Sequence, residues 1–198
     1  MILPFEPYNP TWKDQFNTIK RELDKLLLPI KASVDHIGST SVEGLSAKPI
    51  IDIIVGLEDE NDLDKVPALL ANRQYVYYEK YNIDMPYRRF FVLLREKPDK
   101  LGLPTCIGTF DKIPDRLNDH ALRIAHIHVI PKNSENWVRH IAFRDYLRTH
   151  PNVKDEYQAL KEGLIKHEWL DGNDYNEGKD AFLQVEEKRA IEWYLAQK

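Results

Sequence analysis

The chain has 198 residues, of which 42% are hydrophobic and 30% charged, and its formal net charge is −4. This size and composition are typical of one globular domain, so we expect a single domain over residues 1–198. The negative charge argues against general nucleic-acid binding. The start of the chain lacks the pattern of a signal peptide and no run is long enough to span a membrane, which predicts a cytoplasmic protein. The single cysteine, Cys106, excludes an internal disulfide.

Two helices are predicted in the first third of the chain, on either side of a glycine-serine motif. Asn9 and Pro10 form a helix start, and apolar residues then recur every three or four positions until about Pro29. A second helix is predicted around residues 63–70, with Pro67 in its first turn.

The motif between these helices, residues 34–55, suggests a phosphate site. A short strand over residues 34–37 ends at Gly38, whose backbone freedom suits a tight turn. Ser39, Thr40 and Ser41 are good helix caps, and the start of a short helix attracts anions. Gly38, Ser39 and Thr40 are therefore predicted to hold a phosphate.

The second half of the motif adds a carboxylate and a lysine. Residues 50–55 are apolar enough for a strand buried on both faces, apart from Asp52. A buried carboxylate needs a partner, so Asp52 is a candidate metal ligand and catalytic residue, or it pairs with an arginine or caps a loop. Lys48 precedes this strand and either reaches the same phosphate or is an ordinary edge lysine.

Strands are predicted at residues 75–79 and 88–95, and we expect these two strands to pair. Arg88 and Arg89 open the second of them, so their side chains point to opposite faces and only one can enter a site. We assign phosphate binding to Arg89, with a surface charge pair as the alternative.

Residues 98–118 are broken by prolines and glycines and predict a long excursion with a short hairpin that covers a site. The strand that follows, residues 123–130, carries His126 and His128 on one face. If this strand lies beside that of Asp52, the three side chains form a metal site that suits Zn²⁺, Mn²⁺ or Fe better than Mg²⁺. Otherwise the two histidines bind one phosphate, or they form hydrogen bonds within a polar face.

Everything beyond Pro131 is predicted to be helical, with Ser134 capping the first helix. The spacing of Arg144, Asp145 and Arg148, and that of Tyr157 and Lys161, is typical of solvated helix faces. Lys179 carries no stronger local signal. The predicted class is α+β, with a mixed sheet in residues 1–132 and a helical part in residues 133–198.

The motif His36-Ile-Gly-Ser-Thr-Ser-Val42, with Ala47-Lys-Pro-Ile-Ile-Asp-Ile53, resembles the signature of the GrpB-like proteins, a branch of the nucleotidyltransferase superfamily. Further segments agree in the same order: residues 88–91, 126–129, 137–148, 157–161 and 175–182. The resemblance implies a nucleotidyltransferase-like fold that binds a nucleoside triphosphate with a divalent metal. Active superfamily members use two acids separated by one residue, but here Asp52 is followed at that spacing by Ile54. His128 is expected at the third acidic position.

Three functions follow from these patterns. The first is a transferase that adds a nucleotidyl group to an unknown acceptor, using Asp52 and His128 at the reacting centre. The second is a non-catalytic module that binds a nucleotide or phosphorylated metabolite, as the missing acid at Ile54 indicates. The third is a histidine-triad hydrolase, which the isoleucines at positions 124 and 130 disfavour because a third alternating histidine is absent.

Overall fold

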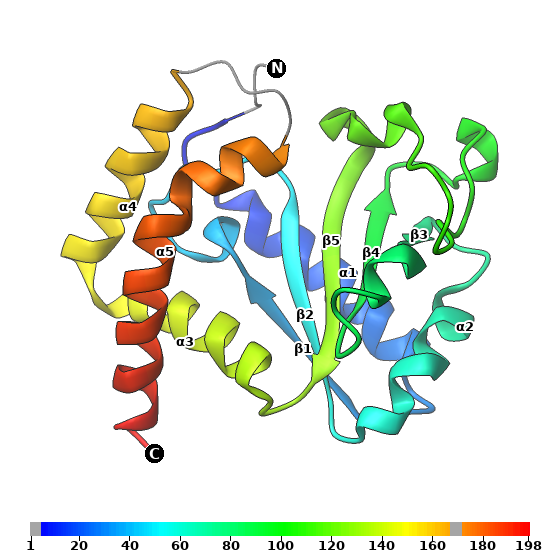
Figure 1. Cartoon of the computed structure of the whole chain (residues 1–198), viewed down its shortest axis with the longest axis horizontal. Helices are drawn as coiled ribbons and strands as arrows, with labels where there is room; N and C mark the ends of the chain where they lie inside the picture. The colour runs from blue at the N-terminus through cyan, green and yellow to red at the C-terminus, as the bar shows by residue number, and fades with distance from the viewer. Residues whose placement is uncertain (1–4, 167–171) are drawn as a thin grey trace.

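A five-stranded mixed sheet lies at the centre of the computed structural model, which describes residues 5–166 and 172–198, with side chains for 5–166 and 178–198 (Figure 1). The strand order is β1-β2-β5-β4-β3. The strands are β1 (Ala32–Ile37), β2 (Ile51–Leu57), β3 (Tyr75–Tyr77), β4 (Arg89–Leu94) and β5 (Arg123–Pro131).

The register of β2 and β5 brings the predicted site residues together. These two strands are parallel, with Asp52 opposite His126 and Ile54 opposite His128. β1 is antiparallel to β2 and β4 is antiparallel to β5, while β3 pairs with β4 as predicted. Side chains alternate along a strand, so Asp52, His126 and His128 all lie on one face of the sheet.

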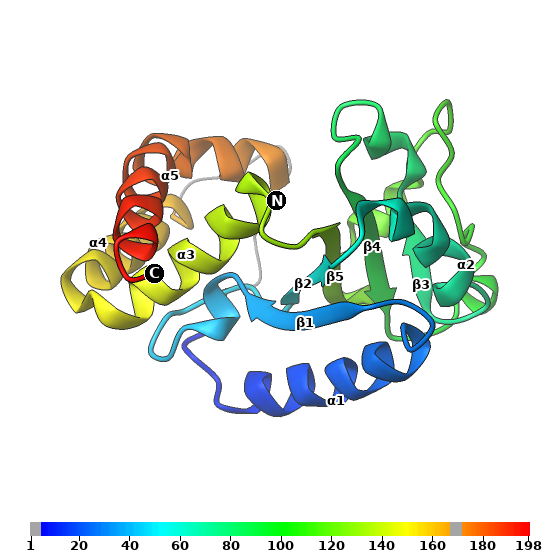
Figure 2. The ribbon, with the colours of Figure 1, turned by 90° about the horizontal axis from the view of Figure 1, so that it is seen from below.

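The other face of the sheet carries the main apolar core. It is covered by α1 (Thr11–Leu26) and by the short α2 (Val66–Leu70), as Figure 2 shows for α1. The sequence begins α1 where predicted, because Oδ1 of Asn9 accepts a hydrogen bond from the Thr11 amide at 3.0 Å. Trp12 and Leu23 of α1 are buried against the strand residues that point to this face. These strand residues include Ile51, Ile53, Ile127 and Val129.

The C-terminal helices pack on the face that carries Asp52. They are α3 (Glu135–Thr149), α4 (Pro151–Leu164) and α5 (Gly172–Leu195), and they form a separate group beside β1 and β2 (Figures 1 and 2). Trp137 and Ile141 of α3 pack against Ile54 of β2 and Ile130 of β5. The predicted α+β class is therefore confirmed. None of the described helices is long and apolar enough to cross a membrane.

The excursion over residues 98–118, all of it described, does not contain the predicted hairpin. It forms two short 3₁₀ helices, η4 (Asp99–Leu101) and η5 (Asp115–Asn118), and one isolated bridge joins Cys106 to Tyr77. Prolines supply no backbone donor, which prevents a regular ladder here. Apolar side chains instead anchor the excursion on the sheet, with Leu103, Ile107 and Leu117 buried against β3 and β4.

The cap of α3 gives a test of the fold. Oγ of Ser134 accepts a hydrogen bond from the Trp137 amide at 3.3 Å. We expect Ser134→Ala to lower the free energy of unfolding by about 1 kcal/mol in urea denaturation, because this amide loses its partner. Ser134→Asp, which keeps a capping oxygen, should stay within about 0.5 kcal/mol of the wild type. Equal losses in the two variants would show that the cap is not what Ser134 contributes.

Candidate functional site

The turn after β1 is packed directly against the carboxylate of Asp52. Gly38 has φ 69° and ψ −175°, a conformation that essentially only glycine adopts. A side chain at this position would place its Cβ 2.5 Å from Oδ2 of Asp52. The predicted glycine turn is present, but the helix after it is a 3₁₀ turn of only three residues, Ser39–Ser41. So short a segment carries little helix dipole, and anion binding there must depend on side chains.

The turn is also held from behind by His36. The imidazole of His36 lies on the α1 face of the sheet, where it stacks on Phe16 with ring centroids 4.7 Å apart. Its Nε2 is 2.9 Å from Oγ1 of Thr40. Thr40 is buried and its hydroxyl makes this contact, although the residue also lines the cavity described below, so its role in holding phosphate stays a prediction.

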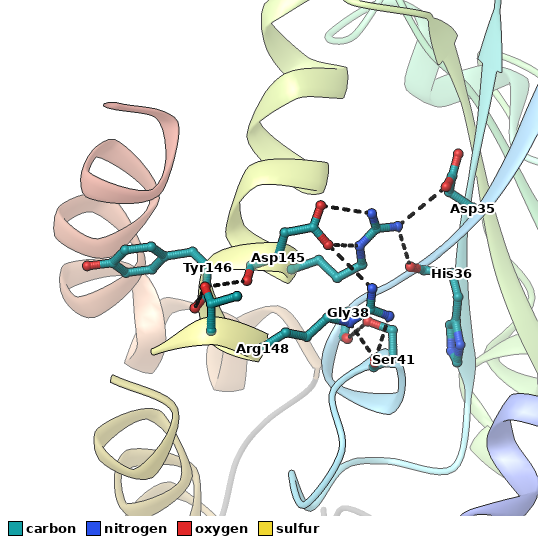
Figure 3. A network of polar contacts seen from close by, with 9 residues as sticks. Asp35, His36, Gly38, Ser41, Asp145, Tyr146 and Arg148 are labelled. Atoms are coloured by element: carbon teal, nitrogen blue, oxygen red, sulfur yellow. Dashed lines mark hydrogen bonds and ion pairs between the residues drawn. The ribbon is translucent and has the colours of Figure 1, made fainter. Parts of the chain in front are cut away.

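Arginines of α3 clamp the turn from a third side (Figure 3). Arg148 donates from Nη2 and Nε to the carbonyl oxygen of Ser41 at 2.7 and 3.1 Å. Arg144 donates to the carbonyl of His36 at 3.1 Å and pairs with Asp145 at 2.7 Å. The predicted solvated helix face is wrong for Arg144, whose side chain is 12% exposed, whereas Arg148 is exposed; both arginines also pair with Asp145. They connect α3 to the motif, and the connection spans more than 100 positions of sequence.

A cavity of about 570 Å³ opens beside the turn and runs along the polar face of the sheet. Ser39, Lys48, Asp52, His126 and His128 line it, as predicted. None of the excursion residues 98–118 lines it; His120, which follows the excursion, and the C-terminal helices contribute further walls. The remaining lining residues are mostly aromatic or cationic: Phe5, Tyr78, Tyr81, Arg88, Phe90, His120, Arg123, Lys161 and Lys179, with Thr40, Ala47, Ile50 and Met85.

Asp52 and His126 form a pair on the wall of this cavity. Oδ1 of Asp52 lies 3.2 Å from Nδ1 of His126. On the other side of the ring, Nε2 of His126 lies 3.2 Å from Nη1 of Arg123. Arginine can only donate, so Nε2 accepts and Nδ1 carries the proton toward Asp52. Arg123 is itself fixed by hydrogen bonds to the carbonyl of Leu117, which places its guanidinium in the cavity wall.

Three lysines from distant segments gather near Ser39 and Asp52. Nζ of Lys161 donates to Oγ of Ser39 at 3.3 Å and to the carbonyl of Ser46, and only 2% of the residue is exposed. Burial lowers the pKa of Lys161 to about 7, and the charge of Lys179 adds to the shift. Burial, with the same neighbour, lowers the pKa of Lys48 to about 8. Asp52 is the only acid among the described lining residues, so an anion in this cavity would relieve the repulsion between the lysines.

Of the two arginines at the start of β4, the structure brings Arg88 to the cavity. Arg89 lies opposite Val129, on the α1 face, and its Nη2 is 2.7 Å from Oδ1 of Asp64. The prediction of Arg89 as a phosphate ligand is corrected, because strand alternation turns it away from the site. Arg88 lies with Nη1 3.3 Å from Nδ1 of His128.

The described donors do not fit a resident divalent metal. Asp52 and His126 lie together, but His128 turns its Nδ1 to Arg88. Among the described side chains, no three His, Cys, Asp or Glu residues are grouped so as to hold a metal ion. Hard cations prefer several oxygen ligands, and the lysines around Asp52 already supply positive charge there.

Sequence reasoning missed most of the cationic lining. Tyr157 and Lys161 are one helical turn apart, and in the structure Nζ of Lys161 lies 4.8 Å from the Tyr157 ring centroid. Their spacing of one helical turn was the available signal, and spacing alone does not show that both residues are buried. Lys179 and Arg123 gave none, because each enters the cavity only through tertiary packing. Tyr175, part of the same predicted segment as Lys179, lies outside the described side chains.

The comparisons with known proteins indicate one and the same family. The sequence profile described as "GrpB protein" matches residues 4–189. The chain is 30% identical to glutamate-rich protein GrpB of Alkalihalophilus pseudofirmus over 176 residues, which cover 89% of this chain and 88% of that protein. It also resembles the crystal structure of conserved protein GrpB from Enterococcus faecalis, with a TM-score of 0.74 and 30% identity, covering 96% and 99% of the two chains.

Other relatives are longer proteins. UPF0157 protein YqkA of Bacillus subtilis is 28% identical over 186 residues, which cover 94% of this chain but 46% of YqkA. A dephospho-CoA kinase of Mycobacterium bovis is 25% identical over 199 residues, again covering 94% of this chain and 46% of that protein. The chain thus spans about half the length of these two relatives.

The close approach of Gly38 to Asp52 predicts a large effect of one added methyl group. We expect Gly38→Ala to lower the free energy of unfolding by about 3 kcal/mol, because strained backbone and a clash with the carboxylate combine. Gly102 is a matched control, since it also has a positive φ of 65° but no atom within 4 Å of an added Cβ.

Gly102→Ala should cost only about 1 kcal/mol by the same urea denaturation. Adding Asp52→Ala to Gly38→Ala should restore part of the loss, because the Oδ2 contact is gone. Similar losses for the two glycine variants, without coupling to Asp52, would contradict the packing described.

Proposed function

This chain belongs to the GrpB family, and we propose that its cavity binds a nucleotide or another phosphorylated small molecule. The observation that carries the proposal is the crowding of Lys48, Lys161 and Lys179 around a cavity with one acid among its described lining residues. Buried ammonium groups repel one another unless an anion lies between them, and a phosphate is the most compact group with enough charge. Ser39 adds a hydroxyl beside Lys161.

Aromatic side chains on the opposite wall support a ligand with a flat ring. Tyr78 and Tyr81 are stacked with centroids 5.4 Å apart, and Phe90 lies edge-on to Tyr78 at 5.5 Å. Tyr81 and Phe90 line the cavity together with Met85. Such a surface accepts the base of a nucleotide by stacking, while the lysines hold its phosphates.

The finer proposal is transfer of a nucleotidyl group to an unknown acceptor. Its support is the position of Asp52, which matches the first acid of the nucleotidyltransferase pattern, and the Asp52–His126 pair beside the lysines. Because Nε2 of His126 accepts from Arg123, this imidazole can take a proton from an acceptor hydroxyl once that hydroxyl displaces Arg123 from Nε2. No resident metal is needed for binding, since the lysines supply the positive charge. The kinase activity named for the mycobacterial relative belongs to a protein about twice as long.

The alternative is a binding module without transfer chemistry. Ile54 favours it, because this buried side chain occupies the place of the second acid and packs on Trp137. Asp52→Asn discriminates between the two functions. A transferase should lose consumption of labelled nucleotide in this variant while still binding it, whereas a module consumes no nucleotide even as the wild type.

The lysine group predicts the effect of one substitution on binding. Lys161→Met should lower the affinity for pyrophosphate and for ATP by at least about tenfold, because one charge-assisted hydrogen bond is lost. Isothermal titration calorimetry measures both affinities. Lys154→Met is the matched control, since Lys154 is on the same helix but lines a different groove. Binding should persist in EDTA. Unchanged affinity in Lys161→Met, or no binding by the wild type, would refute the proposed site.

The lowered lysine pKa values predict how binding depends on pH. A lysine attracts an anion only when protonated, so sulfate affinity should be constant below about pH 7 and fall as the pH rises past the pKa of Lys161 and then of Lys48. Sulfate is chosen because its own charge does not change in this range. Lys161→Arg should remove the lower step, because guanidinium stays protonated. An affinity that rises with pH would contradict the account.

A further inference from the structure

Arg88 contributes a cation to the cavity that has no acidic partner among the described residues. Its guanidinium lies over the Phe90 ring, with Cζ 5.2 Å from the ring centroid. The buried Nε of Arg88 makes no hydrogen bond with any described residue. The neighbouring Arg89, by contrast, donates from Nε and Nη2 to Asp64. A buried donor without an acceptor is costly, which indicates that an acceptor binds here.

His128 adds a second donor at the same place. Arg88 approaches Nδ1 of His128 at 3.3 Å, and because arginine cannot accept, Nδ1 holds the lone pair and Nε2 the proton. Burial holds the pKa of His128 well below its usual value, so the ring is neutral. None of the hydrogen bonds made by described residues uses its Nε2. His140 lies behind it with ring centroids 5.8 Å apart, and Arg139 reaches His140 at 3.4 Å.

This group has different contacts from the lysines, since Arg88 contacts His128 and Phe90 whereas Lys161 contacts Ser39 and Ser46. The charges that act on His128 come from His140, Arg88, His126 and Arg139. Those that act on Lys161 come from Lys179 and Glu162. The Asp52–His126 pair is adjacent to both groups, since Asp52 acts on Lys48 and His126 acts on His128. The cavity therefore has two cationic regions with the carboxylate-imidazole pair between them.

We propose that Arg88 and His128 form a second anion subsite, which holds a carboxylate or phosphate of the acceptor. This inference rests on the proposed function, in which the lysines hold the phosphate of the first ligand. The fork of Nε and Nη2 on Arg88 suits two oxygens of one anion, and the Nε2–H of His128 provides a further donor. An acceptor anchored in this way lies next to the Asp52–His126 pair, where its hydroxyl would displace Arg123 from Nε2 of His126 and lose its proton to that nitrogen.

The subsite is tested by nuclear magnetic resonance of the ¹⁵N-labelled full chain. Inorganic phosphate and acetate are titrated separately, with pyrophosphate first saturating the lysine region. The arginine Nε–H signal that disappears in Arg88→Lys is that of Arg88. We expect this signal to shift saturably in the wild type, and the acetate and phosphate arms tell a carboxylate site from a phosphate site.

The variants separate this inference from the proposed function. Arg88→Lys keeps the positive charge but lacks the two parallel N–H donors. It should lower the affinity for the second anion by at least about tenfold. Arg89→Lys, on the other face of the sheet, should bind it as the wild type does. Lys161→Met should bind pyrophosphate at least about tenfold more weakly but retain the response of the Arg88 signal to the small anions.

Three outcomes overturn the second subsite. If pyrophosphate binds through Lys161 but neither phosphate nor acetate shifts the Arg88 signal, only the subsite is refuted. If pyrophosphate alone shifts that signal and excludes the small anions, the second anionic group belongs to the first ligand and not to an acceptor. If no anion binds at all, the proposed function fails as well.

Discussion

The packing of the Asp52 carboxylate against Gly38 is the constraint on which the site depends. Ile37, the last residue of β1, lies opposite Asp52 in the antiparallel pair, so the chain that leaves β1 must pass over this carboxylate. Only a glycine leaves room for it. The resulting turn is fixed by His36 on one side and by the α3 arginines on the other, which sets the position of Ser39 relative to Asp52.

Around this fixed point the fold collects positive charge from segments far apart in sequence. α4 contributes Lys161, α5 contributes Lys179, and the loop before β2 contributes Lys48. Each ammonium group is partly removed from water, and the pKa of each is lowered by that burial. A protein with a net charge of −4 thus concentrates cations in one cavity. Such an arrangement costs stability in the free protein and favours a multiply charged anion, which is the physical basis of the proposed phosphate binding.

The elements that sequence could predict are those with a local signal. Strand alternation placed His126 and His128 on one face, and the paired strands and the Ser134 cap were also confirmed. Alternation could not show which of Arg88 and Arg89 faces the cavity, because a shift of the strand register by one residue moves each side chain to the other face of the sheet. The lysines of α4 and α5 were missed because a helix pattern does not reveal which cavity a side chain enters. Among the described side chains, Asp52, His126 and His128 do not form the predicted single metal site, because Nδ1 of His126 contacts Asp52 while Nδ1 of His128 contacts Arg88.

The central claim is that the lysine region binds phosphate without a resident metal, and a crystal structure of the full chain with a non-hydrolysable ATP analogue and Mn²⁺ tests it most directly. The account predicts phosphate density within hydrogen-bond distance of Lys161 and Ser39, with the base against Tyr81 or Phe90. Any anomalous Mn²⁺ signal should lie on the nucleotide phosphates. Phosphates bound away from the lysines, or Mn²⁺ bound by Asp52 and His126 in a cavity without nucleotide, would contradict it.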